Sequence, residues 1–457
     1  MRRRSGQRIA IVGAVLVMLT MLSGCSDPWE PAEWYGTTNL PAEVAKGTKV
    51  RFVRFDLAAL ESPAARQFDF PTPDGSTVSL VRKGEQRTAI GGYVWHGKVK
   101  GDDRSIATLS ILNEMLVGKV LMSNGTMYRV DQVTDGIQVV FEVDLAAFPE
   151  GEEPLGVTKP YEAPQGRLRK IAYSGSLQLV QQCDPNHIDM LVVYTDAACA
   201  GALIGGNPNT CTAANDTAIR NRIQDVETET NLIFANSLAS PQVSIVHVER
   251  VEGYVEQASL LEDLETLKVR NLSEAEIEAG QVAPLQAVHD LRDQYRADVV
   301  SLITRPTHKY PQLQKCGKST LMAVEDELFE EYAYTVVPVN CLAANFSFAH
   351  ELGHVMGADH QTHSLPTSFP NNLAYVVANP SGGAHPWRTV MAQNDAACAA
   401  ADKKKGCTRL PYFSNPDPVL EYKGDLMGSA NRNNSEVVSN TVDTISQYRL
   451  SLSCGNT

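Results

Sequence analysis

The chain has 457 residues, of which 43% are hydrophobic and 20% are charged, and its formal net charge is −13. These proportions lie close to the average of soluble globular proteins, so they exclude disordered, collagen-like and polytopic membrane classes, and the length suits two or three domains. A nucleic-acid binder needs a basic surface that displaces counterions from phosphates, and an acidic chain without a long Lys/Arg cluster offers none. We therefore expect no nucleic-acid partner.

The N-terminus has the layout of an export signal. A positively charged segment with Arg2, Arg3, Arg4 and Arg8 precedes an apolar run over residues 9–22, which is too short to span a bilayer comfortably. The sequence Leu22-Ser23-Gly24-Cys25 then resembles a bacterial lipobox, in which cleavage before Cys25 leaves a lipidated N-terminal residue. We expect residues 1–24 to be a lipoprotein-type signal peptide and Cys25 to anchor the mature chain to a membrane. An ordinary signal peptide that happens to contain a cysteine is the alternative.

Residues 25–148 are predicted to form a β-rich domain. Short segments of alternating polarity are separated by turn pairs such as Asp74-Gly75 and Asn124-Gly125, which is typical of an antiparallel sheet or sandwich. The predicted strands are 50–55, 76–81, 92–99, 105–112, 117–121, 127–130 and 136–143. Residues 149–183 follow as an expected linker and processing region, in which 149–154 and 164–170 have the composition of exposed chain.

Residues 184–457 are expected to form the second domain. Strands are predicted over 188–194, 243–248 and 298–304, and helices over 218–237, beginning after Asn215 or Asp216, and 285–295. This alternation indicates a mixed sheet with crossover helices, so the fold class of the whole chain is α+β.

One motif contains the candidate metal ligands and the candidate catalytic residue. Residues 350–360 read HELGHVMGADH. Histidines four apart lie on one face of a helix, so His350 and His354 can approach one Zn²⁺. Gly357 can take a left-handed conformation that ends the helix, which allows His360 to return as a third ligand. Three protein ligands leave a fourth position for water, and this is the mark of a catalytic zinc site.

The sequence offers two further candidates for metal binding, a closed structural zinc site and a calcium site. A closed structural zinc site needs a fourth ligand, and the best candidate is His363. The acidic run at 325–331 suggests calcium, but it lacks regular ligand spacing, so the sequence does not support a calcium site and a solvated loop is favoured.

The motif resembles that of the metzincin metallopeptidases. Metzincins also have a methionine-containing turn beneath the zinc, and the resemblance makes Met391, in Thr389-Val390-Met391-Ala392, the candidate for it. Gln393 stands where astacin-like and serralysin-like members carry a tyrosine. This departure points away from those branches.

Further segments resemble the reprolysin-like bacterial peptidases that include the peptidyl-Asp metalloendopeptidases. The matching segments are 188–195, 230–237, 297–300, 316–317, 348–349 and 412–416. Gln361 departs from the pattern, because reprolysin-like enzymes usually have an Asp directly after the third histidine. The resemblance implies a metzincin-type catalytic domain preceded by a propeptide-like domain.

The predicted function is hydrolysis of protein or peptide substrates by a zinc-dependent endopeptidase. A zinc-activated water would attack the peptide carbonyl with Glu351 as general base, and one catalytic ion suffices. The resemblance implies cleavage on the N-terminal side of acidic residues, which needs a cation in the pocket, and Arg388 and Arg409 are the candidates. Each is also readily interpreted as a structural or surface arginine. An edge strand above the cleft should orient the substrate, and we assign it to residues 334–339.

Cysteine usage indicates an oxidising compartment outside the cytoplasm. Eight cysteines follow residue 182, and eight allow 105 pairings. We favour four of them: Cys199 with Cys211, Cys316 with Cys341, Cys398 with Cys407, and Cys183 with Cys454. A Cys183 thiolate that ligates zinc in a latent form is the alternative for that residue.

Two rival functions stay open. One is a reprolysin-like protease of broad specificity, and the other is a non-catalytic surface-binding lipoprotein with a vestigial zinc site. In the favoured interpretation the chain is exported from a bacterial cytoplasm, held at a membrane by Cys25, and released as a secreted enzyme after processing.

Overall fold

The computed structural model describes residues 27–33, 49–134, 136–143, 150–156, 184–204, 209–269, 285–305, 315–342, 345–402 and 406–449. Within these ranges, no helix combines the length and the apolar character that a membrane crossing requires. Residues 1–24, Cys25 and the proposed Cys183–Cys454 pair lie outside the described residues.

The N-terminal part is one nine-stranded antiparallel sheet with the strand order β1-β2-β9-β8-β7-β6-β5-β4-β3. Its strands are β1 Trp29–Pro31, β2 Val50–Phe55, β3 Gln67–Pro71, β4 Thr77–Arg87, β5 Tyr93–Val99, β6 Asp102–Leu112, β7 Met115–Leu121, β8 Met127–Thr134 and β9 Ile137–Glu142. Tight hairpins join neighbours, and Gly75 and Gly125 take positive φ values of 94° and 87° in two of them. The predicted antiparallel strands are confirmed, and β1 and β3 are additional to them.

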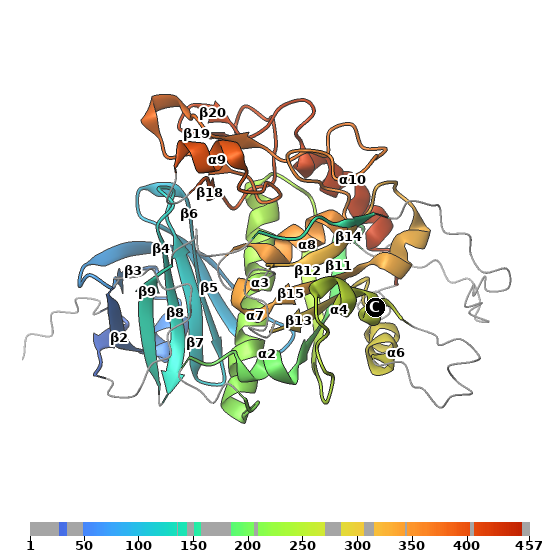
Figure 1. Cartoon of the computed structure of the whole chain (residues 1–457). Helices are drawn as coiled ribbons and strands as arrows, with labels where there is room; N and C mark the ends of the chain where they lie inside the picture. Colours follow the sequence, from blue (N-terminus) through green and yellow to red (C-terminus); the bar gives the residue numbers. More distant parts are fainter. Residues whose placement is uncertain are drawn as a thin grey trace, which may run out of the picture.

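The two faces of this sheet pack against different partners. One face and the short helix α1 (Leu57–Glu61) enclose an apolar core that includes Trp95, Leu109 and Phe70. The opposite face of β5, β6 and β7 packs against helix α3 (Ala213–Asn236). In Figure 1 this helix stands between the nine-stranded sheet and the rest of the molecule.

The second sheet has six strands in the order β10-β14-β15-β13-β11-β12. They are β10 Leu155–Gly156, β11 His187–Thr195, β12 Gln242–Val251, β13 Val299–Thr304, β14 Lys318–Leu321 and β15 Tyr334–Pro338. Strands β12, β11, β13 and β15 are parallel, whereas β14 runs antiparallel to β15. Alternate residues of β11 point to opposite faces, so Met190 and Val192 join the core with α3, and Leu191 and Val193 join the core with α4.

The predicted edge strand is not at the edge. Residues 334–338 form β15, which lies between β13 and β14 inside the sheet. The strand beyond it is β14, a run of four residues (KSTL) that is too short and polar to be recognised as a strand by its pattern, and the edge strand on this side of the sheet is β10. Strand β10 from the predicted linker pairs with β14 in parallel, and Leu155 faces Thr320.

Helix α3 begins five residues before the expected start. Thr212 caps it, accepting a hydrogen bond from the Asn215 N–H, and the Asn215 side chain in turn accepts one from the Thr212 N–H. This reciprocal pair is a capping box with Asn in the position usually taken by Glu or Gln. The apolar stripe of Ile219, Ile223 and Val226 identifies the helix but begins after this cap, so the stripe does not reveal where the helix starts.

Smaller elements complete the C-terminal part. The remaining helices are α2 Asp196–Ala200, α4 Leu260–Lys268, α6 Gln286–Tyr295, α7 Val339–Leu342, α8 Ser347–Val355, α9 Ala396–Ala401 and α10 Asn434–Ile445, with 3₁₀ turns η3 Glu327–Tyr332 and η4 Ser381–Gly383. The short strands are β16 Val376–Val377, β17 Trp387–Arg388, β18 Thr408–Arg409, β19 Glu421–Tyr422 and β20 Asp425–Leu426. In Figure 1, α9, β18, β19 and β20 lie together above the nine-stranded sheet.

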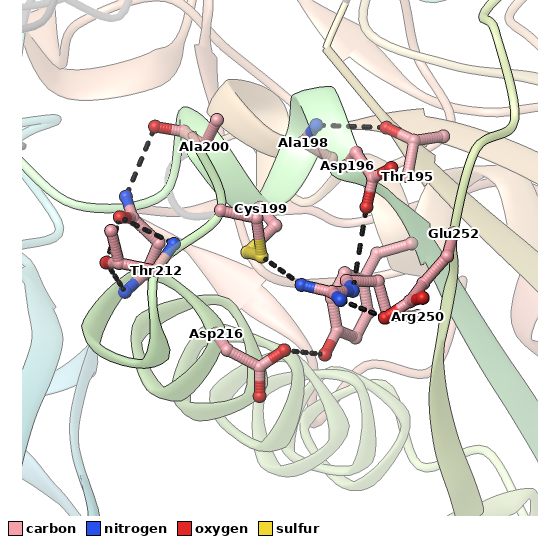
Figure 2. Close-up of a disulfide and its surroundings, with 12 residues drawn as sticks. Thr195, Asp196, Ala198, Cys199, Ala200, Thr212, Asp216, Arg250 and Glu252 are labelled. Carbon is pink, nitrogen blue, oxygen red and sulfur yellow. Dashed lines mark hydrogen bonds and ion pairs between the residues drawn. A yellow bond between two sulfur atoms is a disulfide. The ribbon is translucent and has the colours of Figure 1, made fainter. Parts of the chain in front are cut away.

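Three predicted disulfides are confirmed: Cys199–Cys211, Cys316–Cys341 and Cys398–Cys407. Figure 2 shows the surroundings of the first of them, which links α2 to the start of α3. Arg250 lies beside it, donating to Cys211 Sγ at 3.0 Å and pairing with Asp196 and Glu252. Disulfides are typical of proteins that leave the cytoplasm.

Candidate metal centre and cleft

Helix α8 brings His350 and His354 to one face, one turn apart. The helix ends at Met356, and Gly357 follows with φ +90°, a conformation that strains any residue with a Cβ. The chain reverses there and returns His360 to the same point. The Nε2 atom of His360 lies 3.1 Å from that of His354 and 3.2 Å from that of His350.

Hydrogen bonds to Nδ1 turn the Nε2 atoms of the three rings towards one point. His350 Nδ1 donates to the Val390 carbonyl at 2.9 Å and His354 Nδ1 to the Ala358 carbonyl at 2.8 Å. His360 Nδ1 faces a carboxylate oxygen of Glu153 at 3.1 Å. Such hydrogen bonds to Nδ1 are typical of histidines whose Nε2 binds a metal ion.

The geometry fits zinc. Tetrahedral coordination with Zn–N bonds of about 2.0–2.1 Å separates two ligand nitrogens by roughly 3.3 Å, close to the observed separations. Burial lowers the pKa of His350 and His354 well below the usual value, so both rings are neutral, as metal ligands must be. These three histidines therefore form a group that could hold a metal ion.

Glu351 lies beside the three rings. Its Oε2 accepts a hydrogen bond from Ser319 Oγ at 2.5 Å, whereas its buried Oε1 has no hydrogen-bond partner among the described residues. Burial raises the pKa of this carboxyl to about 8. A Cβ on Gly317 would come within 2.2 Å of Oε1, so only glycine permits the β14 backbone to pass this close. The sequence analysis missed Ser319, because no local pattern links it to a residue 32 positions away.

Met391 packs beneath the helix. A Cβ on Gly353 would lie 2.5 Å from Met391 Sδ, so the thioether contacts the backbone of α8 between the two histidines. Gln361 and Gln393, the two residues that depart from the family pattern, contact each other, since the Gln393 N–H donates to Gln361 Oε1 at 2.9 Å. This bond ties the residue after His360 to the turn that contains Met391.

Arg388 and Arg409 lie side by side on β17 and β18, where they are partners in the strand register. Both are buried, with 5% and 4% of their surface exposed. Backbone carbonyls fix them: Arg388 Nε donates to Cys407 O at 3.1 Å, and Arg409 Nη1 donates to Asn345 O at 2.8 Å. Burial lowers the pKa of Arg409 to about 9, and the adjacent Arg388 charge adds to this effect.

Both guanidinium groups bind Glu150. Arg388 contacts the two carboxylate oxygens at 2.8 and 2.9 Å, and Arg409 Nη2 contacts Oε2 at 2.9 Å. Burial alone would raise the pKa of Glu150, but the two arginines outweigh it and hold that pKa below its usual range. The pair therefore forms a pocket for one carboxylate, which we call the arginine pocket.

Residues 150–152 are less exposed than their composition predicts, whereas the Glu153 side chain is 64% exposed. The Cys316 N–H donates to Glu150 O at 3.1 Å, and the Glu152 N–H donates to Gly317 O at 3.0 Å. A Cβ on Gly151 would lie 3.2 Å from Glu351 Oε1 and 3.4 Å from His350 Nε2. Acidic composition gave the wrong expectation because the matching cations are remote in sequence.

His363 lies away from the metal centre. Its ring is 3.9 Å from Asp359, and its side chain is 45% exposed. Only one other group of potential metal ligands occurs in the described ranges, Cys199, Cys211 and Asp216, and its sulfurs are joined in the disulfide of Figure 2. In the acidic run 325–331, Glu330 pairs with Arg449.

Comparisons with known proteins agree with this geometry. Residues 184–403 match the model of a family described as metallo-peptidase family M12. A peptidyl-Asp metalloendopeptidase of Stenotrophomonas maltophilia (strain R551-3) is 26% identical over 414 residues, covering 88% of this chain and 86% of that protein. One from Xanthomonas campestris pv. campestris is 26% identical over 413 residues, covering 87% and 85%. One from Pseudomonas fragi is 32% identical over 116 residues, covering 25% and 67%.

Proposed function

The chain belongs to metallopeptidase family M12 and is a metalloendopeptidase, and from this premise we propose that it is a metzincin-type zinc enzyme that uses Glu351 as general base and cleaves before acidic residues. The observation that carries the proposal is the convergence of three imidazoles, with His360 Nε2 3.1 Å from His354 Nε2 and 3.2 Å from His350 Nε2, next to Glu351 Oε1, which has no hydrogen-bond partner among the described residues.

His350, His354 and His360 would hold one zinc ion through Nε2. When bound, Zn²⁺ supplies a Lewis acid that polarises the peptide carbonyl and makes water a stronger acid. Val390 and Ala358 fix two of the ring orientations through their hydrogen bonds to Nδ1, and Glu153 does so for His360 only in the unprocessed chain. Met391 would be the floor of the site and no ligand.

Glu351 Oε1 would accept the proton of the attacking water and then pass it to the leaving amine. Its buried position supports this role, because a carboxyl with a raised pKa retains a proton long enough to transfer it. A nearby divalent cation favours the carboxylate and would restore the basic form at neutral pH. Ser319 holds Oε2, which directs Oε1 to the cleft.

The arginine pocket would set specificity. Its occupation by the Glu150 carboxylate supports binding of an acidic side chain there, and two fixed guanidinium groups suit a carboxylate through charge-assisted hydrogen bonds. The name peptidyl-Asp metalloendopeptidase, given to three relatives, agrees with this preference.

We also propose the division of the chain into a signal peptide with lipidated Cys25, a propeptide-like domain over 25–148, a processing region over 149–183 and a catalytic domain over 184–457. What supports removal of the first domain is the ionic part of its contact surface on α3. Lys119 pairs with Asp225 and Glu229 at 3.2 and 2.7 Å, and Arg222 pairs with Asp131 at 2.9 Å. This part hydrates well when exposed, whereas Leu121, Met127 and Phe141 add an apolar part that is continuous with the core of the second domain.

The test compares wild type with Glu351→Ala on a peptide that contains one Ala-Asp bond, using processed protein with and without a zinc chelator. We expect the substitution and the chelator each to reduce hydrolysis by at least 10³-fold, as the loss of a general base or of the metal implies. Unchanged hydrolysis by Glu351→Ala would refute this mechanism. Cleavage-site profiling on a peptide mixture then decides between acidic and broad specificity.

Absence of hydrolysis in every form, with retained zinc binding, would favour the surface-binding lipoprotein instead.

A further inference from the structure

We propose that Gln393 is a catalytic residue whose side-chain amide donates a hydrogen bond to the oxygen of the attacked peptide carbonyl. This inference rests on the proposed function, because it places the attacked bond between the metal centre and the arginine pocket. It deepens that function by naming a second group of the chain, besides Glu351, that contacts the reacting atoms.

The Gln393 amide points into the metal centre. Its Nε2 lies 3.5 Å from Nε2 of His360, the atom that also approaches Nε2 of His354 and of His350. Within the described ranges the amide has no other hydrogen-bond partner, and the residue is half-buried. Its N–H groups are therefore available to a substrate bound at this point.

The neighbours of Gln393 in the chain connect it to the arginine pocket. The Ala392 carbonyl accepts hydrogen bonds from both arginines of the pocket, and the Asn394 N–H donates to the Glu150 carboxylate inside it. In the proposed reaction, the residue in this pocket follows the attacked carbonyl directly. Gln393 thus lies between the pocket and the metal centre, where that carbonyl must be.

Gln361 fixes the backbone of Gln393 in this place. Its Oε1 accepts a hydrogen bond from the Gln393 N–H at 2.9 Å, and its Nε2 donates to the Gln393 carbonyl at 3.4 Å. Gln361 is held in turn by Arg432, which donates to its carbonyl at 2.9 Å. The backbone that carries the amide is therefore in position before substrate binds, and a donor placed in advance needs little reorganisation during the reaction.

The attack of water creates the charge that this donor would stabilise. The water oxygen forms a bond to the carbonyl carbon, one proton of the water moves to Glu351, and the electron pair of the carbonyl π bond moves to the carbonyl oxygen. An amide N–H binds this oxygen more strongly as its negative charge grows, so the contact favours the transition state over bound substrate. Glu351 acts on the water, and Gln393 acts on the carbonyl oxygen.

The first test replaces Gln393 with methionine, which has a similar length but no N–H. Each variant is expressed as the full chain, matured in the same way and loaded with zinc, and mass spectrometry checks that all have the same N-terminus. We expect Gln393→Met to lower kcat on the Ala-Asp peptide at least tenfold while KM stays within threefold. Gln447→Met is the matched control and should behave as wild type, because Gln447 is exposed and its amide bonds only to Asp443.

Gln393→Glu distinguishes a hydrogen-bond donor from a metal ligand. A carboxylate has the size of the amide and can bind a cation, but it cannot donate when ionised. A donor role predicts that kcat falls at least as far as in Gln393→Met, while zinc affinity, measured by competition with a chelator, is no weaker than in wild type. Retained hydrolysis in Gln393→Glu would overturn the inference, as would a zinc affinity that falls together with kcat in Gln393→Met.

Binding of a phosphinic peptide provides a measurement that does not depend on hydrolysis. A phosphinic group in place of the Ala-Asp bond has tetrahedral geometry and charged oxygens, as the transition state does. Calorimetry should show at least tenfold weaker binding of this peptide to Gln393→Met than to wild type. Binding of the Ala-Asp peptide itself, measured in a Glu351→Ala background, should stay within threefold. An equal loss for both peptides, or no loss for either, would contradict the inference.

Failure of this inference differs from failure of the proposed function. A wild type that hydrolyses no peptide rejects the proposed function. A wild type that hydrolyses the Ala-Asp peptide, with Gln393→Met equally active, rejects the role of Gln393 alone. A thermal unfolding curve for each variant checks that it is folded.

Discussion

Single side chains set the chemistry of the cleft through contacts with groups far away in the sequence. Ser319 directs the Glu351 carboxyl, and Val390 and Ala358 orient two imidazole rings through their carbonyls. Each contact fixes a reactive group in one orientation, and pre-organisation of this kind is worth more in a buried site than in water.

Replacing Ser319 with alanine removes the hydrogen bond to Glu351 and leaves Oε2 free to turn. A buried hydrogen bond to a charged group contributes about 1.5–3 kcal/mol, so we expect kcat to fall about 10- to 100-fold with little change in KM. Steady-state kinetics on the Ala-Asp peptide measures this. Ser301→Ala is the control, because Ser301 is also buried in the sheet but bonds Thr335. A loss of equal size in both variants would show that the effect is only structural.

Replacing Arg388 with lysine keeps a positive charge but removes the two-pronged contact with a carboxylate. We expect the ratio of kcat/KM for Asp over Asn in otherwise identical peptides to fall about 10- to 100-fold in the processed enzyme. A ratio that stays at the wild-type value would remove Arg388 from the specificity pocket.

At the scale of elements, the short strand β14 contributes to several contacts around Glu351 and the edge of the sheet. It provides the edge that binds β10, it contains Ser319, and Gly317 precedes it directly against Glu351. A strand of four residues needs further contacts to keep it in this position. The disulfide Cys316–Cys341 fixes the start of β14 to α7, which lies just before the zinc-binding helix in the chain.

Removing this disulfide with Cys316→Ser and Cys341→Ser should lower the free energy of unfolding by about 3 kcal/mol, as expected for a loop closed over 25 residues. It should also reduce kcat, since the edge strand loses its anchor. The control is the pair Cys199→Ser and Cys211→Ser, which removes a disulfide that closes a loop of 12 residues away from the cleft. It should lower the free energy of unfolding by a similar amount while kcat is retained. Urea unfolding and peptide hydrolysis distinguish the two variants.

At the scale of the whole molecule, α3 belongs to two packing units. Its apolar stripe joins the second sheet, and its polar side packs on the N-terminal sheet through Asn221, Gln224 and neighbouring residues. Glu227 lies on this interface, where it accepts hydrogen bonds from Gln86 and from the Ile245 N–H but has no cationic partner among the described residues. Burial raises its pKa to about 7.

This raised pKa predicts how the contact between the two parts depends on pH once the linker is cut. The associated form binds the extra proton, so its advantage is complete below the ordinary pKa of about 4.5 and is lost as pH rises to about 7. The change amounts to at most about 3 kcal/mol. Dissociation constants of nicked protein between pH 5 and 8 measure it, and Glu227→Gln should reduce this pH dependence to the part that comes from Glu229, whose pKa burial also raises to about 7. Tighter association at higher pH would contradict the assignment.

How much of this the sequence predicts depends on the distance between contacting residues. The three histidines and Glu351 come from eleven consecutive positions, so helical spacing and the chain reversal at Gly357 bring them together. The main strands follow from local alternation. In contrast, Glu150 reaches Arg388 and Arg409 across 238 and 259 positions, and Glu153 reaches His360 across 207. Such contacts depend on tertiary packing, and for this reason the segment was predicted to be an exposed linker.

The arginine pocket also constrains the order in which the molecule can assemble. Two adjacent guanidinium groups are almost fully buried, and closing β17 against β18 without an anion would bring two like charges together out of water. Glu150 is synthesised more than 200 residues before either arginine, so it can serve as their counterion as soon as they emerge. We therefore expect the N-terminal part to be needed during biosynthesis, and its removal would leave the pocket with an unbalanced positive charge in a chain that is otherwise acidic.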